Sequence, residues 1–231
     1  MELKKKKHDY DDTVIIYEGA QVHESVEIGP FTIVYPNVEI EKGTKIMSSV
    51  ILGKSPHVGK TQVKLTKLKE RTTVKENSFI GDQAIIYSGV EVGRNNYIAD
   101  KALLRENVIL DDDVVIGTAV VVSFNARIGK KSKIMTMSNI AGNMIIGDNV
   151  FVGVHVCSVT DNNPNQMSKR EDQKGPQIAD SVFIGSNVTL LPGVEINEGI
   201  TVGGGAVVTK NLEKPNSIYF GNPAAFYKSK D

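Results

Sequence analysis

Aliphatic residues recur at every sixth position along most of this chain. From Val74 to Val152, fourteen successive positions in this register are Ile, Leu or Val, without one polar residue. An amphipathic helix would repeat its apolar residues at intervals of three and four, and a half-buried strand would alternate at two. Neither period matches six, so the pattern predicts a structural repeat.

Two further positions in each six-residue unit indicate its shape. Two residues before the aliphatic position lies a residue that is mostly small or β-branched, and two same-facing residues indicate a short strand. Three residues after the aliphatic position, Gly or Asn recurs, and both tolerate the positive φ of a tight bend. Three bends close a triangle, so eighteen residues form one coil of a parallel β-helix with coils about 4.8 Å apart. The expected turn residues of the central part are Asn77, Gly89, Asn95, Asn107, Asn125, Asn143 and Asn149.

The register is interrupted twice. Leu52 and Val74 are 22 residues apart, and Val152 and Ile178 are 26 residues apart, instead of six. The extra residues must leave the wall of the helix as loops. Long insertions on a regular scaffold are usually binding loops or lids.

These breaks define the expected organisation. We predict a single all-β domain over residues 1–231, with excursion loops at about 53–73 and 155–177. A tail at 209–231 covers the open end, because exposed strand edges invite further pairing. Seven, fourteen and six aliphatic positions make 27, which corresponds to a parallel β-helix of about nine triangular coils.

Composition limits the class of partner. Lys plus Arg equals Asp plus Glu at 27 each, so no net charge attracts nucleic acid or an acidic membrane surface. No apolar run approaches the length of a signal-peptide core or a membrane span, so we expect a cytoplasmic protein. The single Cys157 rules out an intrachain disulfide framework and fits that compartment.

The last part of the chain resembles the end of hexapeptide-repeat acyltransferases. The resemblance is carried by residues 180–196, by the Gly-Gly-Gly-Ala-Val-Val-Thr-Lys run at 203–210 and by Gly-Asn-Pro-Ala at 221–224. It implies a left-handed helix, a homotrimer and acyl-coenzyme A bound along the later coils between subunits. Small residues let pantetheine approach the backbone, and a lysine suits a phosphate. The cofactor-binding residues that the resemblance implies are Gly185, Gly203, Gly205, Ala206 and Lys210.

The second loop separates two branches of that family. Maltose- and galactoside-type O-acetyltransferases carry a catalytic histidine in a Gly-His-Pro-like context, where this chain has Asn162-Asn163-Pro164. The run from Thr160 to Pro164 is more similar to that of N-acyltransferases of nucleotide-linked amino sugars. An amine whose pKa is about 7.7 to 8 is already partly neutral, whereas a sugar hydroxyl needs a positioned base. Loss of the histidine therefore favours an amine acceptor.

The expected function is transfer of an acyl group, with acetyl as the first choice, from acyl-CoA to the amino group of a nucleotide-linked amino-deoxy sugar. Such a product serves cell-surface polysaccharide biosynthesis. A sugar O-acetyltransferase is the alternative among enzymes, and a noncatalytic β-helix scaffold or binding module is the alternative of another class. No metal is expected, since the four histidines are scattered on different edges or tails.

Residues eighteen apart stack on one edge of the prism, and this places the candidate site. His155, at the root of the second loop, is the candidate base for the amine proton, and Asp100 is the candidate to orient or deprotonate the ammonium. Both have a purely structural alternative, as an exposed turn histidine and a turn aspartate. Glu106 lies on the adjacent edge and would join the site across a trimer interface. The expected substrate-binding residues are Asp82, Thr118, Thr136, Asp161, Asn162, Asn163 and Glu106.

Overall fold

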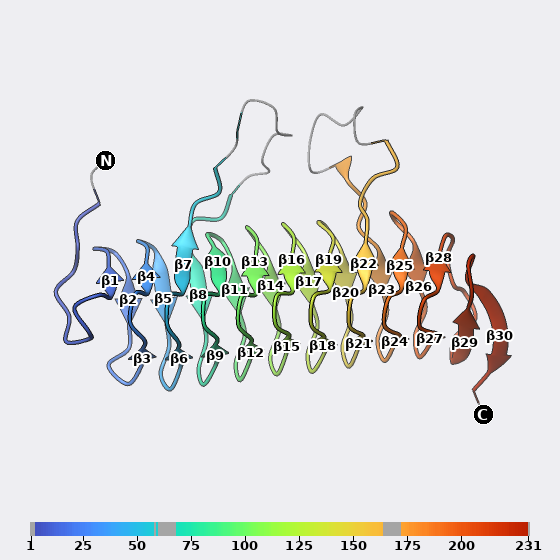
Figure 1. The fold of residues 1–231 in the computed structure, drawn as a ribbon, viewed down its shortest axis with the longest axis horizontal. Coiled ribbons are helices and arrows are strands. Elements are labelled where there is room, and N and C mark those ends of the chain that lie inside the picture. Colours follow the sequence, from blue (N-terminus) through green and yellow to red (C-terminus); the bar gives the residue numbers. More distant parts are fainter. Residues whose placement is uncertain (1–2, 58, 60–67, 164–171, 231) are drawn as a thin grey trace.

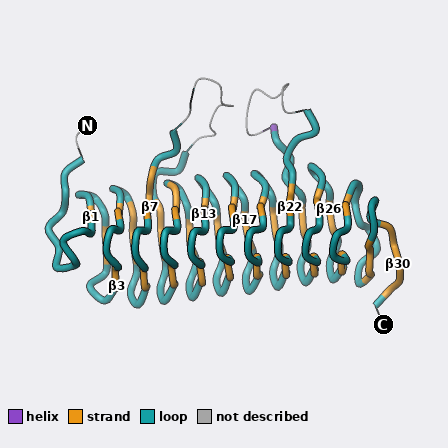
Figure 2. The backbone as a smooth tube through the Cα atoms, in the orientation of Figure 1, coloured by secondary structure: helices purple, strands orange, loops and turns teal. Residues whose placement is uncertain are grey.

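The computed structural model describes residues 3–57, 59, 68–163 and 172–230, which form a long parallel β-helix (Figure 1). Each coil contributes one short strand to each of three sheets, so the cross-section is triangular. The all-β prediction is confirmed, and the architecture is consistent with the left-handed β-helix that the resemblance implies (Figure 2). In these described ranges there is no helix long and apolar enough to cross a membrane.

The three faces of the prism are numbered in the order in which the chain enters them. The first face contains β1 (Ile15–Ile16), β4 (Ile33–Val34), β7 (Ile51–Lys54), β10 (Ile85–Tyr87), β13 (Leu103–Leu104), β16 (Val121–Val122), β19 (Asn139–Ile140), β22 (Cys157–Ser158), β25 (Thr189–Leu190) and β28 (Val207–Val208). The second face contains β2 (Gln21–Val22), β5 (Val38–Ile40), β8 (Thr72–Val74), β11 (Glu91–Val92), β14 (Ile109–Leu110), β17 (Arg127–Ile128), β20 (Ile145–Ile146), β23 (Gln177–Ile178) and β26 (Glu195–Ile196). The third face contains β3 (Glu27–Ile28), β6 (Lys45–Ile46), β9 (Phe79–Ile80), β12 (Tyr97–Ile98), β15 (Val115–Ile116), β18 (Lys133–Ile134), β21 (Phe151–Val152), β24 (Phe183–Ile184), β27 (Thr201–Val202), β29 (Ser217–Phe220) and β30 (Ala225–Ser229).

The aliphatic register fills the interior of the prism. Ile86, Ile116 and Ile128, for example, are 0% exposed. The predicted bends are also confirmed, because Asn77 and Asn107 have φ of 57° and 60°. The pattern of aliphatic and turn residues therefore accounts for both the core and the corners.

Both excursion loops leave the prism at the same corner, between the first and second faces (Figure 1). We call this corner the loop edge. The first loop connects β7 to β8 and comprises residues 55–71, a shorter stretch than the predicted 53–73. The second loop connects β22 to β23. The corner between the third and first faces carries His155, and we call it the histidine edge.

The second excursion begins after Ser158 and not at residue 155, as the register predicted. Cys157 pairs with Asn139 and Thr189 of the two adjoining coils, so β22 continues the wall. Ser158 takes the inward position and is 3% exposed. Its Oγ donates to Asn139 O and accepts Ala141 N–H, both at 2.8 Å. A polar residue in an aliphatic column hid this strand from the sequence pattern.

Ten coils stack in the structure, one more than predicted. Ser158 adds one strand, and two residues outside the six-residue register complete the last coil. Leu212 forms a parallel bridge with Ile196, and Tyr219 pairs with Val202. Both Leu212 and Tyr219 are buried, so they close the end of the core. Beyond them β30 pairs antiparallel with β29 and ends the third face, within the stretch predicted to form the tail.

Candidate functional site

The returning arms of the two loops lie against the loop edge. A Cβ on Gly89 would lie 2.8 Å from the carbonyl oxygen of Lys69, so only glycine lets the first arm pass. The N–H of Gly193 donates to the carbonyl oxygen of Lys174 at 2.9 Å, where the second arm crosses a later corner. Glycine thus marks the corners that the loop arms cover.

Between the two arms, the corner residue is asparagine in three successive coils. Asn107, Asn125 and Asn143 have φ of 60°, 56° and 56°. They extend over two coil spacings, about 10 Å. The three turns that carry them form a strip bounded by a loop arm at each end, which we call the saddle. It consists of residues 105–107, 123–125 and 141–143.

A buried ion pair lies at the first turn of the saddle. The Glu106 side chain is 0% exposed, and Arg105 Nε and Nη2 donate to its two oxygens at 2.8 and 3.1 Å. The Arg105 guanidinium lies over the Tyr87 ring, 5.1 Å from the centroid. Because a buried carboxylate needs a partner, Arg105 holds Glu106 inside the edge. Glu106, a predicted substrate contact, is therefore shielded from solvent, and Arg105 and Tyr87 lie on the outer side.

Sequence reasoning missed Arg105 and Tyr87. A signal was present, since residues 87 and 105 are eighteen apart and therefore stack, and an arginine above an aromatic ring is a favourable pair. The six-residue register did not reveal it because both residues follow the inward position and point outward.

A shallow hollow of about 180 Å³ lies at the far end of the saddle, beside the root of the second loop. Of the predicted residues, Asp161 follows its rim. Asp161 Oδ1 accepts Asn163 N–H at 2.6 Å, and its Oδ2 is buried without a hydrogen-bond partner. Asn162 and Asn163 are exposed, and Pro164 lies outside the described residues. The lining residues are Ser123, Phe124, Asn139, Ala141, Gly142, Ser158, Val159 and Thr160.

The histidine edge collects the other predicted residues, as the eighteen-residue stacking requires. His155 N–H donates to Thr136 O at 3.1 Å, and the turns of Thr118, Asp100 and Asp82 follow in the same column. His155, Asp100, Asp82 and Thr118 are exposed, and Thr136 is half-buried. This edge is not the one from which the second loop emerges, because β22 lies between them. Within one chain, His155 and the loop residues therefore belong to different corners.

The two aspartates of the histidine edge stabilise turns. Asp100 Oδ1 accepts Asp82 N–H at 3.0 Å, and Asp82 Oδ1 accepts Ser48 N–H at 2.8 Å. Asp112 makes the same bond to Arg94 N–H, at 2.8 Å, on the remaining corner. This contact occupies one carboxylate oxygen of Asp100 and leaves the other for a second task.

Side chains on the histidine edge are kept at a conformational cost. Four residues of this edge have φ between 55° and 59°, a left-handed conformation that glycine and asparagine adopt at least cost. They are Lys101, Ala119, Met137 and His155. The left-handed region costs other residues roughly 1–2 kcal/mol each. The loop edge uses Asn or Gly at these positions, so turn formation alone does not require the side chains of the histidine edge. The corner between the second and third faces also holds Lys131 and Ser181 at φ of 59° and 57°, so this strain is shared by two corners and does not by itself identify the site.

The five predicted cofactor residues do not share one surface. Gly185 and Gly203 lie on the histidine edge, where a Cβ would meet Gly204 N at 2.5 Å and Phe220 Cβ at 2.9 Å. Gly205, with φ of 72°, has open space at the same edge. Ala206 is 0% exposed, so its side chain belongs to the core. Lys210 is exposed on the loop edge.

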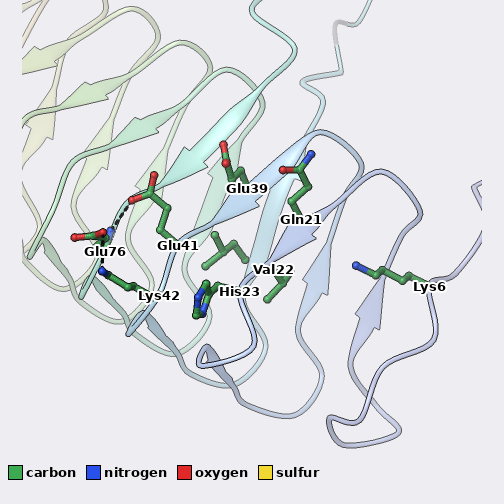
Figure 3. A pocket seen from close by; sticks show the side chains of 9 residues that line it. Lys6, Gln21, Val22, His23, Glu39, Glu41, Lys42 and Glu76 are labelled. Atoms are coloured by element: carbon green, nitrogen blue, oxygen red, sulfur yellow. Dashed lines mark hydrogen bonds and ion pairs between the residues drawn. The ribbon is translucent and has the colours of Figure 1, made fainter.

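A larger hollow of about 470 Å³ lies on the first three coils (Figure 3), and its lining residue Glu39 accepts a hydrogen bond from Arg71 at the end of the first loop. Its carboxylates are engaged: Glu76 pairs with Lys42 at 3.4 Å, and the Glu76 N–H donates to Glu41 at 3.3 Å. It contains none of the predicted site residues. Over the described ranges, no group of three or more His, Cys, Asp or Glu residues could hold a metal ion.

Two family models match parts of the chain. The model described as bacterial transferase hexapeptide (six repeats) matches residues 175–210, and that described as hexapeptide repeat of succinyl-transferase matches residues 71–99. Both stretches therefore match hexapeptide-repeat models, and the resemblance of the chain to the hexapeptide-repeat acyltransferases is confirmed.

Curated relatives match over limited stretches. A Lysinibacillus sphaericus protein named "Probable macrolide acetyltransferase" is 47% identical over 53 residues, 23% of this chain and 29% of that protein. The acyl-[acyl-carrier-protein]–UDP-N-acetylglucosamine O-acyltransferase of Psychrobacter is 29% identical over 106 residues, 44% of this chain and 38% of that protein. The chain thus spans well under half the length of these relatives.

Solved structures resemble the fold over most of the chain. LpxA from Acinetobacter baumannii superposes with a TM-score of 0.58 at 23% identity, covering 94% of this chain and 73% of that one. UDP-N-acetylglucosamine acyltransferase from Campylobacter jejuni gives a TM-score of 0.58 at 16% identity, covering 92% and 73%. At these identities the likeness establishes the fold.

We predict that Arg105→Met lowers the free energy of unfolding by about 3 kcal/mol, because it leaves the Glu106 carboxylate buried without this partner. Arg127→Met is the matched control: Arg127 is 55% exposed and lies 3.4 Å from Asp111, so its loss should cost less than about 1 kcal/mol. Urea unfolding of both variants measures the difference. Equal, small losses would show that Glu106 does not depend on Arg105.

Proposed function

We propose that this protein transfers an acyl group, with acetyl as the first choice, from acyl-CoA to the amino group of a nucleotide-linked amino-deoxy sugar. The reaction would supply cell-surface polysaccharide biosynthesis in the cytoplasm. The observation that carries the proposal is the position of both excursion loops on one edge of a hexapeptide-repeat prism, with a polar saddle between them. The names of the relatives, which are acetyl- and acyltransferases, support the chemistry.

The proposal includes a homotrimer with the first face turned toward the threefold axis. The outward residues of the second face include Glu39 and Arg127, and those of the third face include Lys133. The described strands of the first face present no charged residue at the equivalent positions, and an uncharged, mostly aliphatic face is the one that a copy of the chain would bury. The outward residues of this face are Ile15, Ile33, Ile51, Ile85, Leu103, Val121, Asn139, Cys157, Thr189 and Val207.

This arrangement joins the two candidate edges. When three first faces surround an axis, the histidine edge of one subunit meets the loop edge of the next. His155 and Asp100 then face the saddle and second loop of the partner subunit. Gly203 and Gly205 likewise face the edge that carries Lys210 of the partner subunit. The proposed cleft therefore has acyl-CoA along the glycine side and the acceptor sugar on the loop side.

The main requirement of this reaction is that the protein positions the amine against the thioester and provides an acceptor for one proton. The acceptor nitrogen attacks the thioester carbonyl, the C–N bond forms, the C–S bond breaks, and the electron pair leaves on sulfur. His155 accepts the amine proton, and Asp100 orients the ammonium through its second carboxylate oxygen. Polar groups of Asp161, Asn162 and Asn163, beside the saddle, bind the acceptor. Because the amine is already partly neutral near pH 8, no histidine is needed at Asn163.

O-acyl transfer to a nucleotide sugar is the second candidate. It is favoured by the Psychrobacter relative, whose name specifies an O-acyltransferase that uses an acyl-carrier protein. In that case His155 would deprotonate a hydroxyl instead of an ammonium. Replacing His155 would then lower the rate of acyl transfer by a larger factor than it does with an amine acceptor.

We predict release of CoA thiol when the protein is incubated with acetyl-CoA and a panel of UDP- and dTDP-linked amino sugars. Matched sugars with a hydroxyl in place of the amine serve as the control. Faster release with the amines supports N-acyl transfer, and faster release with the hydroxyl sugars supports the second candidate. If no thiol is released from acetyl-CoA or from an acyl-carrier protein, the result favours the alternative that the protein is a noncatalytic scaffold or binding module.

We predict that His155→Ala and Asp100→Asn each lower kcat/KM at least tenfold without a change in stability. The amide oxygen introduced by Asp100→Asn can still accept the Asp82 N–H, so only the charge is lost. Asp112→Asn removes a charge from an equivalent turn bond on another corner and should leave kcat/KM unchanged. Steady-state kinetics and thermal unfolding decide: unchanged kcat/KM in His155→Ala and Asp100→Asn would remove both residues from proton transfer.

We predict that Leu103→Glu dissociates the trimer, because it places three carboxylates near the axis. Ile109→Glu makes the same change on the charged second face and should leave assembly intact. Light scattering coupled to size exclusion gives the mass of each variant. A trimeric Leu103→Glu protein would show that the first face does not line the axis.

A further inference from the structure

An unbroken chain of side-chain amides runs along the saddle from one loop arm to the other. Its four hydrogen bonds connect backbone atoms of the first loop to backbone atoms of the second. They run from Lys69 N–H to Asn107 Oδ1 (3.0 Å), from Asn107 Nδ2 to Asn125 Oδ1 (3.0 Å), from Asn125 Nδ2 to Asn143 Oδ1 (2.9 Å) and from Asn143 Nδ2 to Gln173 O (2.9 Å).

The ends of this chain fix the direction of every amide within it. The backbone N–H of Lys69 can only donate, so Asn107 must present its oxygen to the first loop and its nitrogen to Asn125. The backbone carbonyl of Gln173 can only accept, so Asn143 must present its nitrogen to the second loop. Asn125, in the middle, has one orientation that satisfies both neighbours. Amides aligned head to tail also polarise one another, which strengthens the chain as a unit.

The chain joins segments that the fold otherwise keeps apart. The first loop leaves the third coil, after β7, and the second leaves the eighth coil, after β22. Five coil spacings at about 4.8 Å separate these exits, roughly 24 Å. Asn125 lies on the sixth coil and hydrogen-bonds to Asn107 and Asn143, and to no described residue of either arm. It is nevertheless the link through which the two arms are joined.

We propose that the amides of Asn107, Asn125 and Asn143 hold the arms of the two loops in a fixed mutual position, so that Asn125 is a positioning residue for the acceptor site. The coupling between the arms stands on the hydrogen bonds alone. Its effect on the acceptor rests on the proposed function. The two steps are therefore tested by separate measurements.

Asn125→Gly is the first test, because glycine occupies the same corner position at Gly89 and Gly193 and accepts a positive φ. Native-state hydrogen exchange reports on the Lys69 amide in the first arm and on the Lys174 amide, which donates to Thr160 O, in the second. We expect both amides to exchange about fivefold faster, the factor that loss of one typical hydrogen bond represents.

Asn95→Gly is the matched control. Asn95 has φ of 55° and donates to Asp113 of the next coil at 3.2 Å, on a corner that carries no excursion loop. It loses an inter-coil side-chain bond of the same kind, and both reporter amides should exchange at the wild-type rate. Equal acceleration by both variants, or no acceleration by Asn125→Gly, would overturn the coupling.

Asn125→Asp tests the direction of the chain. The carboxylate still accepts from Asn107 Nδ2 but cannot donate to Asn143 Oδ1. We expect the Lys69 amide to keep its protection and the Lys174 amide to exchange about fivefold faster. Loss of protection at Lys69 alone would contradict the assigned amide orientations.

Kinetics test the second step. We expect Asn125→Gly to raise the KM of the acceptor about fivefold while the KM of acetyl-CoA and the thermal unfolding temperature stay at the values of Asn95→Gly. Equal changes in both KM values would assign Asn125 a general structural role. If no acyl transfer is detected in the wild type, the proposed function fails, while hydrogen exchange still decides the coupling.

Discussion

The whole molecule depends on one constraint, which is that no coil can bury its own side chains. Each eighteen-residue coil supplies six inward residues, two on each side of the triangle, and these are covered only by the coils above and below. Register is therefore strict: a shift by one residue would turn an aliphatic face outward. Function cannot use the prism interior, which is filled at Ile116 and its equivalents. It is confined to outward faces, corners and the two loops that break the repeat.

That constraint explains how much the sequence could predict. The aliphatic register and the Asn and Gly turns follow directly from stacking, so the all-β helix and its corners were predictable from residues alone. Ser158 was not, because its hydroxyl satisfies Asn139 O and Ala141 N–H inside the wall and so takes a place that the pattern reserves for an aliphatic residue. Because of this one residue, the sequence pattern placed the start of the second loop at the wrong corner. It also missed one of the three wall segments by which the observed ten coils exceed the predicted nine.

The same error affects the candidate site. Stacking by eighteen correctly put Asp82, Asp100 and His155 on one edge, since that inference needs only the repeat. It could not show that the loop leaves from the next edge, nor that Glu106 is buried under Arg105. Those facts depend on side-chain direction at a corner, which spacing does not encode. The physical consequence is that one chain holds the parts of the predicted site on two separate corners.

The histidine edge and the loop edge lie apart in one subunit, as expected for a site that forms only where two subunits meet. The first face, whose outward residues from Ile15 to Val207 carry no charge, separates the histidine edge from the loop edge, and burying this face around an axis brings those edges of different subunits together. Such a cleft is only as well defined as the loops that border it. Besides the contacts that each arm makes where it returns to the wall, the asparagine amides tie both arms to three coils of the wall. The rigid repeat would then provide more than a support, because its corner side chains would set the distance between two binding loops.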